Sequence, residues 1–154
     1  MVTKLQVENA QRAWGEGIVS IAAAHNTGMD YVERARTHIK SLYAYDISPV
    51  LFKPTLAVDV QFRPTFEGAL SYFVAGNDEY SEDKGFAIKG WTKVRFENEG
   101  IIINGKSAIA MGNYFFMTPE GDEVKVEFSF GYIVDSGGSL RINLHHSSIP
   151  ASLE

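Results

Sequence analysis

The polar residues best suited to chemistry are gathered near the end of the chain, in the string Arg141-Ile-Asn-Leu-His-His-Ser-Ser-Ile-Pro150. Its composition is typical of a β-strand, in which successive side chains point to opposite faces. One face is then wholly polar and carries Arg141, Asn143, His145 and Ser147. The other carries Ile142, Leu144, His146 and Ser148. An imidazole beside hydroxyls can relay protons near neutral pH, so this is either a plain surface strand or part of a site for proton transfer.

A protein-bound metal fits this string poorly. His145 and His146 are adjacent and point to opposite faces, while His25 and His38 lie on separate predicted helix surfaces, so the histidines cannot readily share one ion. The chain has no cysteine, which excludes thiolate ligands and disulfides. It also lacks a Gly-x-Ser-x-Gly elbow, and its Gly-Gly-Ser string lies between strands with no helix to receive a phosphate. We expect no metal and no cofactor.

Composition narrows the choice of partner and location. The chain has 154 residues, 45% of them hydrophobic, and a formal charge of -5 with its Lys and Arg residues scattered, so it offers no basic stripe for nucleic acid. No stretch approaches the roughly 20 apolar residues that span a bilayer, and the N-terminus is too polar for a signal peptide. We expect a single domain over residues 1–154 that binds neither nucleic acid nor membrane and lies in the cytoplasm.

The elements that position the polar string begin with two helices. Apolar residues recur every three or four positions from Val7 to Ala22, which predicts a helix from about Thr3 to Ala24. Thr27 followed by Asp30 is typical of a helix N-cap. The second helix is expected to end near Asp46.

Beyond Pro49 the period changes to two, which predicts strands. The expected strands are Val50 to Ala57, Ala69 to Ala75, Gly90 to Glu97, Ile101 to Met117, Glu123 to Val134 and Ser139 to Ser148. The expected turns are Asn98 to Gly100, Pro119 to Gly121 and Asp135 to Gly138, and residues 76–84 form a polar, acidic, exposed loop.

Two helices followed by a strand meander predict an α+β fold, in which the helices pack on a strongly curved antiparallel sheet that forms a cone-shaped, cystatin-like barrel around a polar pocket. Gly112 and Gly131 are expected bend points, because glycine inside a strand often marks a bulge. Lys53 and Arg63 are expected to be solvated charges on strands.

Five strings, taken together and in this order, are similar to the iota class of carbonic anhydrases. They are Val50-Leu-Phe-Lys-Pro-Thr55, Ala69-Leu-Ser-Tyr-Phe-Val74, Glu82-Asp-Lys-Gly-Phe-Ala-Ile88, Met111-Gly-Asn-Tyr114 and His145-His-Ser-Ser-Ile-Pro150. The resemblance runs from Trp14 to Pro150, almost the whole chain. It implies a fold similar to nuclear transport factor 2 and to the association domain of the calmodulin-dependent kinase, and a homodimer.

The resemblance also implies a function and a set of site residues. It implies reversible hydration of carbon dioxide to bicarbonate without a metal, with Thr55, Tyr72, His145 and Ser147 as the catalytic groups. Thr55, Tyr72 and Ser147 hold the attacking water and the bicarbonate oxygens, and His145, whose unperturbed pKa is about 6.5, accepts or relays the proton near neutral pH. Thr65 competes with Thr55 for the role of pocket threonine.

Apolar side chains and other functions complete these expectations. Leu70 and Phe130 are candidates for sheltering carbon dioxide, although both fit a plain core as well. The alternatives to the enzyme are a module of the same fold that binds a small carboxylate-like ligand, and an assembly domain. Neither alternative needs the histidine, tyrosine and threonine strings together. A curved open sheet favours a homodimer that covers its convex face.

Overall fold

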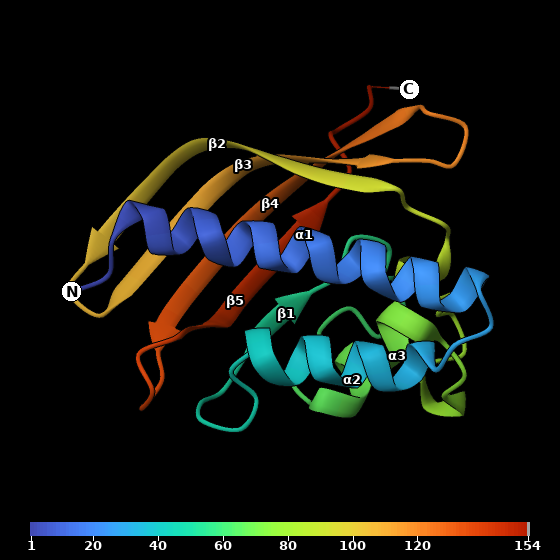
Figure 1. Ribbon diagram of the computed structural model, residues 1–154, viewed down its shortest axis with the longest axis horizontal. Helices are drawn as coiled ribbons and strands as arrows, with labels where there is room; N and C mark the ends of the chain where they lie inside the picture. Colours follow the sequence, from blue (N-terminus) through green and yellow to red (C-terminus); the bar gives the residue numbers. More distant parts are fainter. Residues whose placement is uncertain (154) are drawn as a thin grey trace.

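A computed structural model describes residues 1–153, and Figure 1 shows their arrangement. The helices are α1 (Lys4–Asn26), α2 (Tyr31–Leu42) and α3 (Phe66–Val74), with the short 3₁₀ turns η1 (Asp78–Tyr80) and η2 (Phe86–Ile88). The strands are β1 (Leu51–Lys53), β2 (Lys93–Asn104), β3 (Ser107–Met117), β4 (Glu123–Val134) and β5 (Leu140–Ser148). Within these residues, no helix is long and apolar enough to cross a membrane.

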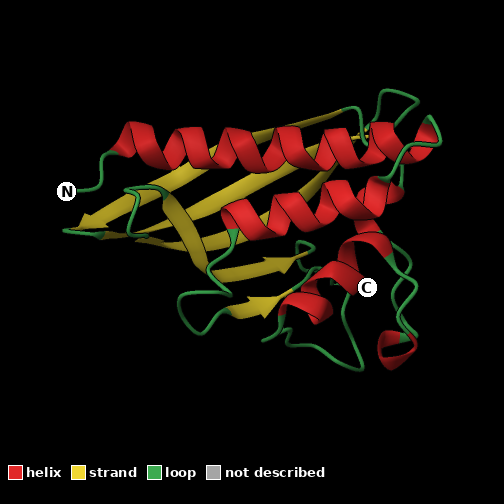
Figure 2. Cartoon of the chain, turned by 60° about the horizontal axis from the view of Figure 1, so that its bottom comes forward, coloured by secondary structure: helices red, strands yellow, loops and turns green. Residues whose placement is uncertain are grey.

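The strands form one five-stranded sheet in the order β1-β5-β4-β3-β2. All neighbours are antiparallel except β1, which runs parallel to β5. The sheet is curled but open, and α1 crosses its concave face (Figure 1). On the same side of the sheet, α2 lies beside α1 and α3 lies beside α2 (Figures 1 and 2). The predicted α+β class with helices packed on a curved sheet is confirmed.

Local sequence explains the helix boundaries. Thr3 caps α1 by accepting a hydrogen bond from the Gln6 backbone N–H, and the Gln6 side chain accepts from the Thr3 N–H in return. The predicted cap of the second helix is wrong in detail. Thr27 ends α1 and donates its hydroxyl to Ala23 O, whereas Asp30 caps α2 by accepting from Glu33 N. Two capping residues three positions apart thus end one helix and begin the next.

The predicted strand at residues 69–75 is wrong, because this segment is helix α3. Thr65 caps the helix by accepting from Gly68 N, and Glu67 lies in the first turn, where its charge suits the helix dipole. Nearly every residue of α3 is buried, so the apolar run has no polar face. Periodicity alone cannot distinguish such a run from a buried strand. The consequence is that Tyr72 reaches the interior from a helix.

The predicted turn at Asn98 to Gly100 is a bulge inside β2, and β2 continues to Asn104. The hairpin lies at residues 105–106, within the segment predicted as one strand from Ile101 to Met117. Gly112 faces the bulge, and a Cβ there would lie 2.1 Å from Glu97 O, so no side chain fits without moving the backbone. Gly112 therefore marks an irregularity in the sheet, as predicted.

A second bulge decides which residues of β5 face the interior. Gly131 pairs with Leu144, but Tyr132 pairs with Ile142, so Asn143 is the extra residue. The predicted alternation is therefore wrong before this point. His145 and Ser147 share the inner face with Ile142, in place of Asn143 and Arg141. The predicted separation of His145 from His146 holds, because His145 is buried and His146 is exposed.

The inner face of the sheet and helix α1 form an aromatic core. Trp14 of α1 is surrounded by three buried rings, Tyr114, Phe116 and Phe130, whose centroids lie 5.4 to 6.0 Å from its own. Phe128 is also buried and packs against Tyr114. Each such ring contributes roughly 1.5–3 kcal/mol on burial. This core also fixes the faces of β3 and β4, since a slip of one residue would expose every ring.

Candidate functional site

Side chains from four distant segments meet at the end of β5 in one run of hydrogen bonds. Thr55 Oγ1 lies 2.5 Å from Ser147 Oγ, and the Tyr114 hydroxyl donates to Ser147 Oγ at 2.5 Å. Tyr114 Oη lies 3.0 Å from His145 Nε2, and His145 Nδ1 lies 2.8 Å from Tyr43 Oη. All of these residues are buried except Thr55, which is half-buried. The run therefore leads from the core towards solvent at Thr55.

Tyr72 joins this group from the opposite side. Its hydroxyl oxygen accepts a hydrogen bond from the Leu56 backbone N–H at 3.2 Å. Burial raises the pKa of Tyr72 to about 12, although hydrogen bonds from Leu56 and Thr55 oppose the rise. The phenol is thus neutral at neutral pH. The structure brings together all four side chains predicted as catalytic, and we call Thr55, Tyr72 and Ser147 the hydroxyl site.

His145 lies behind the hydroxyl site between aromatic rings. Its ring stacks on Phe52 with centroids 4.8 Å apart and lies 4.2 Å from the Phe130 centroid. Burial lowers the pKa of His145 well below its usual value of 6.5, and His146 and His38 lower it further. The unperturbed pKa of about 6.5, on which the predicted proton-relay role of His145 rested, therefore does not hold in the folded protein. The physical reason is that a charged imidazole in this apolar setting loses its hydration.

Two residues of the run, Tyr43 and Tyr114, were absent from the predicted site. Tyr43 lies just past α2, and its hydroxyl contacts His145 and Trp14 Nε1. Tyr114 was part of a family string, Met111 to Tyr114, without a role being assigned to it. Tyr114 alternates with Phe116 on one face of the predicted strand, and this spacing of two aromatic residues was the signal that could have found it.

The remaining candidates are separated by the structure. Thr65 caps α3 and is exposed, so its hydroxyl has a structural task away from Ser147. Leu70 lines a groove between α2 and α3 together with Arg36 and Glu67. Side chains two positions apart on a helix point about 200° away from each other, so Leu70 lies on the opposite side of α3 from Tyr72. Phe130, by contrast, packs directly against His145.

Lys53 bridges the backbone of two site residues. It is half-buried, and its Nζ donates to Thr55 O at 3.3 Å and to Ser147 O at 3.1 Å. The prediction of a freely solvated charge is wrong for this lysine, because the two carbonyls replace part of its hydration. Burial lowers its pKa. Lys53 therefore ties β1 and the Thr55 loop to β5.

Metal-binding geometry is absent from residues 1–153, where no three His, Asp or Glu side chains come together in a way that could hold an ion. His145 also has both ring nitrogens within hydrogen-bonding distance of tyrosine hydroxyls. The arrangement can do chemistry through neutral hydrogen-bond donors and acceptors, which can orient a small molecule and stabilise an oxyanion.

The comparison with known families decides between the remaining possibilities. The family model for metal-independent carbonic anhydrase matches residues 5–149. A metal-independent carbonic anhydrase from Nostoc sp. strain PCC 7120 is 40% identical over 152 residues, covering 97% of this chain and 74% of that protein. The chain belongs to the family of metal-independent carbonic anhydrases.

Solved structures agree with this assignment. The crystal structure of a cyanobacterial iota-carbonic anhydrase complexed with bicarbonate has a TM-score of 0.96 and 40% identity, covering 98% of this chain and 94% of that one. A calcium/calmodulin-dependent protein kinase II association domain from Xanthomonas campestris has the same fold, with a TM-score of 0.55 and 23% identity over 86% of this chain and 83% of that one. So does a nuclear transport factor 2-like protein from Streptomyces avermitilis (TM-score 0.57, 14% identity, 96% and 95% covered).

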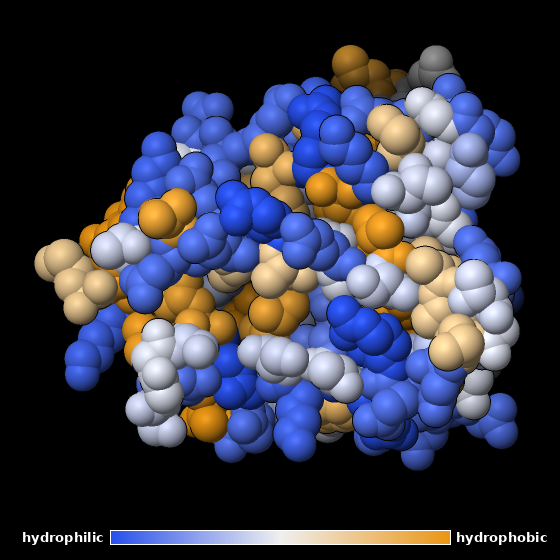
Figure 3. Space-filling view, in the orientation of Figure 1, coloured by the Kyte–Doolittle hydropathy of each residue, from blue (hydrophilic) through white to orange (hydrophobic). Residues whose placement is uncertain are grey.

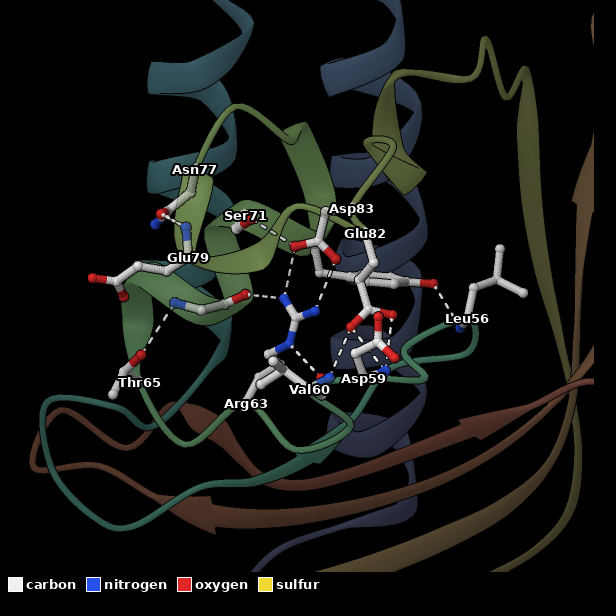
Figure 4. Close-up of polar contacts among 12 residues, drawn as sticks. Leu56, Asp59, Val60, Arg63, Thr65, Ser71, Asn77, Glu79, Glu82 and Asp83 are labelled. Carbon is white, nitrogen blue, oxygen red and sulfur yellow. Dashed lines mark hydrogen bonds and ion pairs between the residues drawn. The ribbon is translucent and has the colours of Figure 1, made fainter.

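In this carbonic anhydrase, the segment that carries Thr55 is held by a buried ion pair (Figure 4). The Arg63 guanidinium donates to both Asp83 carboxylate oxygens at 2.8 Å, and also to Gly68 O and Val60 O. The Arg63 side chain has no exposed surface and that of Asp83 has 2%. The prediction of a solvated Arg63 is therefore wrong, because it lies in the interior with its donors occupied.

Glu82, in the acidic loop of residues 76–84, holds the backbone of the residues that precede Arg63. The Glu82 carboxylate accepts hydrogen bonds from the backbone N–H groups of Val58, Asp59 and Val60 at 2.7 to 3.0 Å (Figure 4). These contacts lower the pKa of Glu82. The loop that looked like a plain exposed, acidic segment therefore binds the backbone directly after Thr55 and fixes its path.

We expect Arg63→Met to lower the free energy of unfolding by about 3–5 kcal/mol, because it leaves the Asp83 carboxylate buried without a partner. Urea unfolding followed by circular dichroism measures the change. The double change Arg63→Met with Asp83→Leu recovers part of the loss.

The matched control is Arg36→Met, because Arg36 pairs with Glu67 in an exposed ion pair whose side chains are 42% and 58% exposed. It should cost no more than about 1 kcal/mol. An Arg63→Met loss no larger than that of Arg36→Met would contradict the buried pair as the anchor of this segment.

Proposed function

We propose that the chain hydrates carbon dioxide reversibly to bicarbonate without a metal, at the hydroxyl site of Thr55, Tyr72 and Ser147. The observation that carries the proposal is the convergence of these three hydroxyls, from a loop, a helix and a strand, in front of the neutral ring of His145. The carbonic anhydrase relative whose structure contains bicarbonate has nearly the same fold over almost the whole chain.

The site has to replace what a zinc ion does elsewhere. Zinc lowers the pKa of bound water from 15.7 to about 7, which corresponds to about 12 kcal/mol. One aimed hydrogen-bond donor to a developing oxyanion contributes about 10²–10³ in rate, and orientation of the two reactants removes several kcal/mol more. Two or three donors together with orientation reach useful rates. The sum of these contributions is of the same order as the contribution of zinc.

In the proposed reaction, Tyr72, Thr55 and Ser147 hold the attacking water, and Tyr72 and Thr55 donate to the oxygens that gain negative charge. A bond forms between the water oxygen and the carbon of carbon dioxide, and that water loses a proton. His145 is a poor acceptor for this proton because burial holds its pKa far below neutrality. We therefore assign His145 to holding Tyr114 and Ser147 in place. The proton leaves to solvent at the half-exposed Thr55.

Carbon dioxide itself is apolar, and the rings beside His145 provide an apolar wall. Phe130 and Phe52 lie against the imidazole, next to the hydroxyl site. We propose Phe130 as part of the shelter for carbon dioxide. No contact supports the same role for Leu70. An assembly function would leave the buried hydroxyls without a task, and the family of the chain favours an enzyme over a module that only binds a ligand.

Removing single polar groups tests the catalytic assignment. We expect Tyr72→Phe and Ser147→Ala each to lower the rate of carbon dioxide hydration about 10²-fold. Tyr72→Phe removes a donor to the developing charge, and Ser147→Ala removes the hydroxyl that orients Thr55. His145→Ala should lower the hydration rate as well, because Tyr114 then loses the hydrogen-bond partner that holds its hydroxyl in place. Stopped-flow hydration assays with and without chelator provide the measurement, and wild-type activity should persist with chelator.

Tyr132→Phe is the control, since Tyr132 is buried in β4 with no part in the site. The assignment fails if Tyr72→Phe and His145→Ala fold and still hydrate carbon dioxide at the wild-type rate. Activity that chelator abolishes would instead point to a metal.

The pH profile gives a second test. Burial lowers the pKa of His145 and raises the pKa of Tyr72 to about 12. Burial also raises the pKa of Tyr114. No group of the site therefore changes charge near neutrality, and kcat for hydration should be constant from about pH 6 to pH 9. If His145 were a base with its ordinary pKa, kcat would fall as the pH drops below about 6.5.

We propose that two chains associate through the outer face of the sheet. Ile102, Ile109 and Met111 are 64%, 50% and 60% exposed and lie side by side on β2 and β3. On the helix-covered face, the apolar patches are small and separated by hydrophilic residues (Figure 3). An apolar group on an open sheet is typical of a self-association surface. A cytoplasmic location remains a prediction from the sequence.

The double change Ile109→Lys with Met111→Lys should convert the dimer to a monomer, because it buries two charges in the proposed interface. Size-exclusion chromatography with light scattering should show the mass falling from twice the 17.1 kDa of the chain to that of one chain. Leu5→Lys on α1, where Leu5 is 63% exposed, is the control and should leave the mass unchanged. A monomeric wild type would overturn the proposal.

A further inference from the structure

The run of hydrogen bonds behind the hydroxyl site continues past His145 to an indole. Trp14 Nε1 donates to Tyr43 Oη at 3.0 Å. From there the contacts pass through Tyr43, His145, Tyr114 and Ser147 to Thr55, with distances of 2.8, 3.0, 2.5 and 2.5 Å. We call this run of six residues the polar chain. Its inner end at Trp14 is buried, and its outer end at Thr55 is half-buried.

The direction of every hydrogen bond follows from the inner end. An indole N–H can only donate, so the Tyr43 oxygen accepts and its single hydrogen remains for another partner. Among residues 1–153, the Tyr43 hydroxyl has one further polar partner, His145 Nδ1. Nδ1 therefore accepts, and a neutral imidazole then carries its hydrogen on Nε2.

The same reasoning continues outward. His145 Nε2–H donates to Tyr114 Oη, and the Tyr114 hydroxyl donates to Ser147 Oγ. Ser147 then has its own hydrogen for Thr55 Oγ1. The hydroxyl hydrogen of Thr55 is then directed into the hydroxyl site, where it reaches the Tyr72 oxygen or an oxygen of the substrate. The polar chain thus offers a hydrogen-bond donor to the hydroxyl site, which suits an oxygen that gains negative charge.

An indole also closes the inner end to protons, since it has no lone pair with which to accept one. The polar chain therefore cannot carry a proton from the site into the core. The direction of the hydrogen bonds in the polar chain is set by Trp14 and Tyr43, which are separated from the hydroxyl site by His145 and Tyr114. Removing the Tyr43 hydroxyl frees the imidazole to move its hydrogen to Nδ1, and Tyr114 can then donate to Nε2 in place of Ser147.

We propose that Trp14 and Tyr43 are positioning residues for the hydration reaction, because together they fix the direction of the polar chain so that Thr55 presents its hydroxyl hydrogen to the substrate. The inference rests on the proposed function of the hydroxyl site. It adds a role for two residues that touch neither carbon dioxide nor bicarbonate.

The tautomer of His145 tests the direction without any activity assay. Protein labelled with ¹⁵N-histidine gives a long-range ¹H–¹⁵N spectrum in which the two tautomers have different patterns, and replacing the other three histidines in turn assigns His145. The wild type should carry the hydrogen on Nε2. In Tyr43→Phe, which keeps the ring, a signal from the Nδ1–H tautomer should appear. A purely structural role for Tyr43 would leave the tautomer unchanged.

Kinetics complete the experiment. Tyr43→Phe should lower kcat for carbon dioxide hydration about tenfold with KM little changed, the size of effect expected for one misdirected hydrogen bond. Trp14→Phe, which lacks the N–H, should shift the tautomer in the same direction. Tyr132→Phe removes a buried hydroxyl outside the polar chain and should change neither the tautomer nor kcat.

Two outcomes would overturn the inference while the proposed function stands: a wild-type His145 with its hydrogen on Nδ1, or a folded Tyr43→Phe with unchanged tautomer and kcat. A wild type that fails to hydrate carbon dioxide would overturn the proposed function instead. In that case the tautomer still reports whether Trp14 sets the direction of the polar chain.

Discussion

The burial of His145 is the constraint on which the site depends. Its ring lies between Phe52 and Phe130, where a charge is costly, so the imidazole is neutral and each nitrogen needs a partner. Tyr43 and Tyr114 supply these partners from two different elements. The requirement to satisfy one buried ring therefore fixes the end of α2, the inner face of β3 and the end of β5 relative to one another.

The second requirement is to hold an irregular loop against this rigid centre. Thr55 follows a strand of only three residues, which cannot fix its position alone. Lys53 binds the carbonyls of Thr55 and Ser147, Glu82 binds three successive amides after Thr55, and Arg63 pairs with Asp83. Charged groups thus surround the hydroxyl site without entering the polar chain. The hydroxyl site itself remains neutral, as the proposed stabilisation of developing charge by hydrogen bonds requires.

Sequence patterns predicted the elements whose faces alternate or repeat clearly. The first helix, the strands β4 and β5 and the hairpin at Asp135 to Gly138 follow from periodicity and turn chemistry. Helix α3 was missed because a run buried on every side has no periodic face. The bulge at Asn143 was missed for a similar reason, since a single extra residue changes the inward set without changing composition.

The sequence by itself determined the α+β class, the separation of His145 from His146 and, through family strings, the candidates Thr55, Tyr72, His145 and Ser147. Only the tertiary structure decided the choice of Thr55 over Thr65 as the threonine beside Ser147, the lowered pKa of His145 and the part of Trp14 in the site. The physical reason is that hydrogen-bond direction and desolvation depend on contacts between segments far apart in the chain, and local spacing does not encode such contacts.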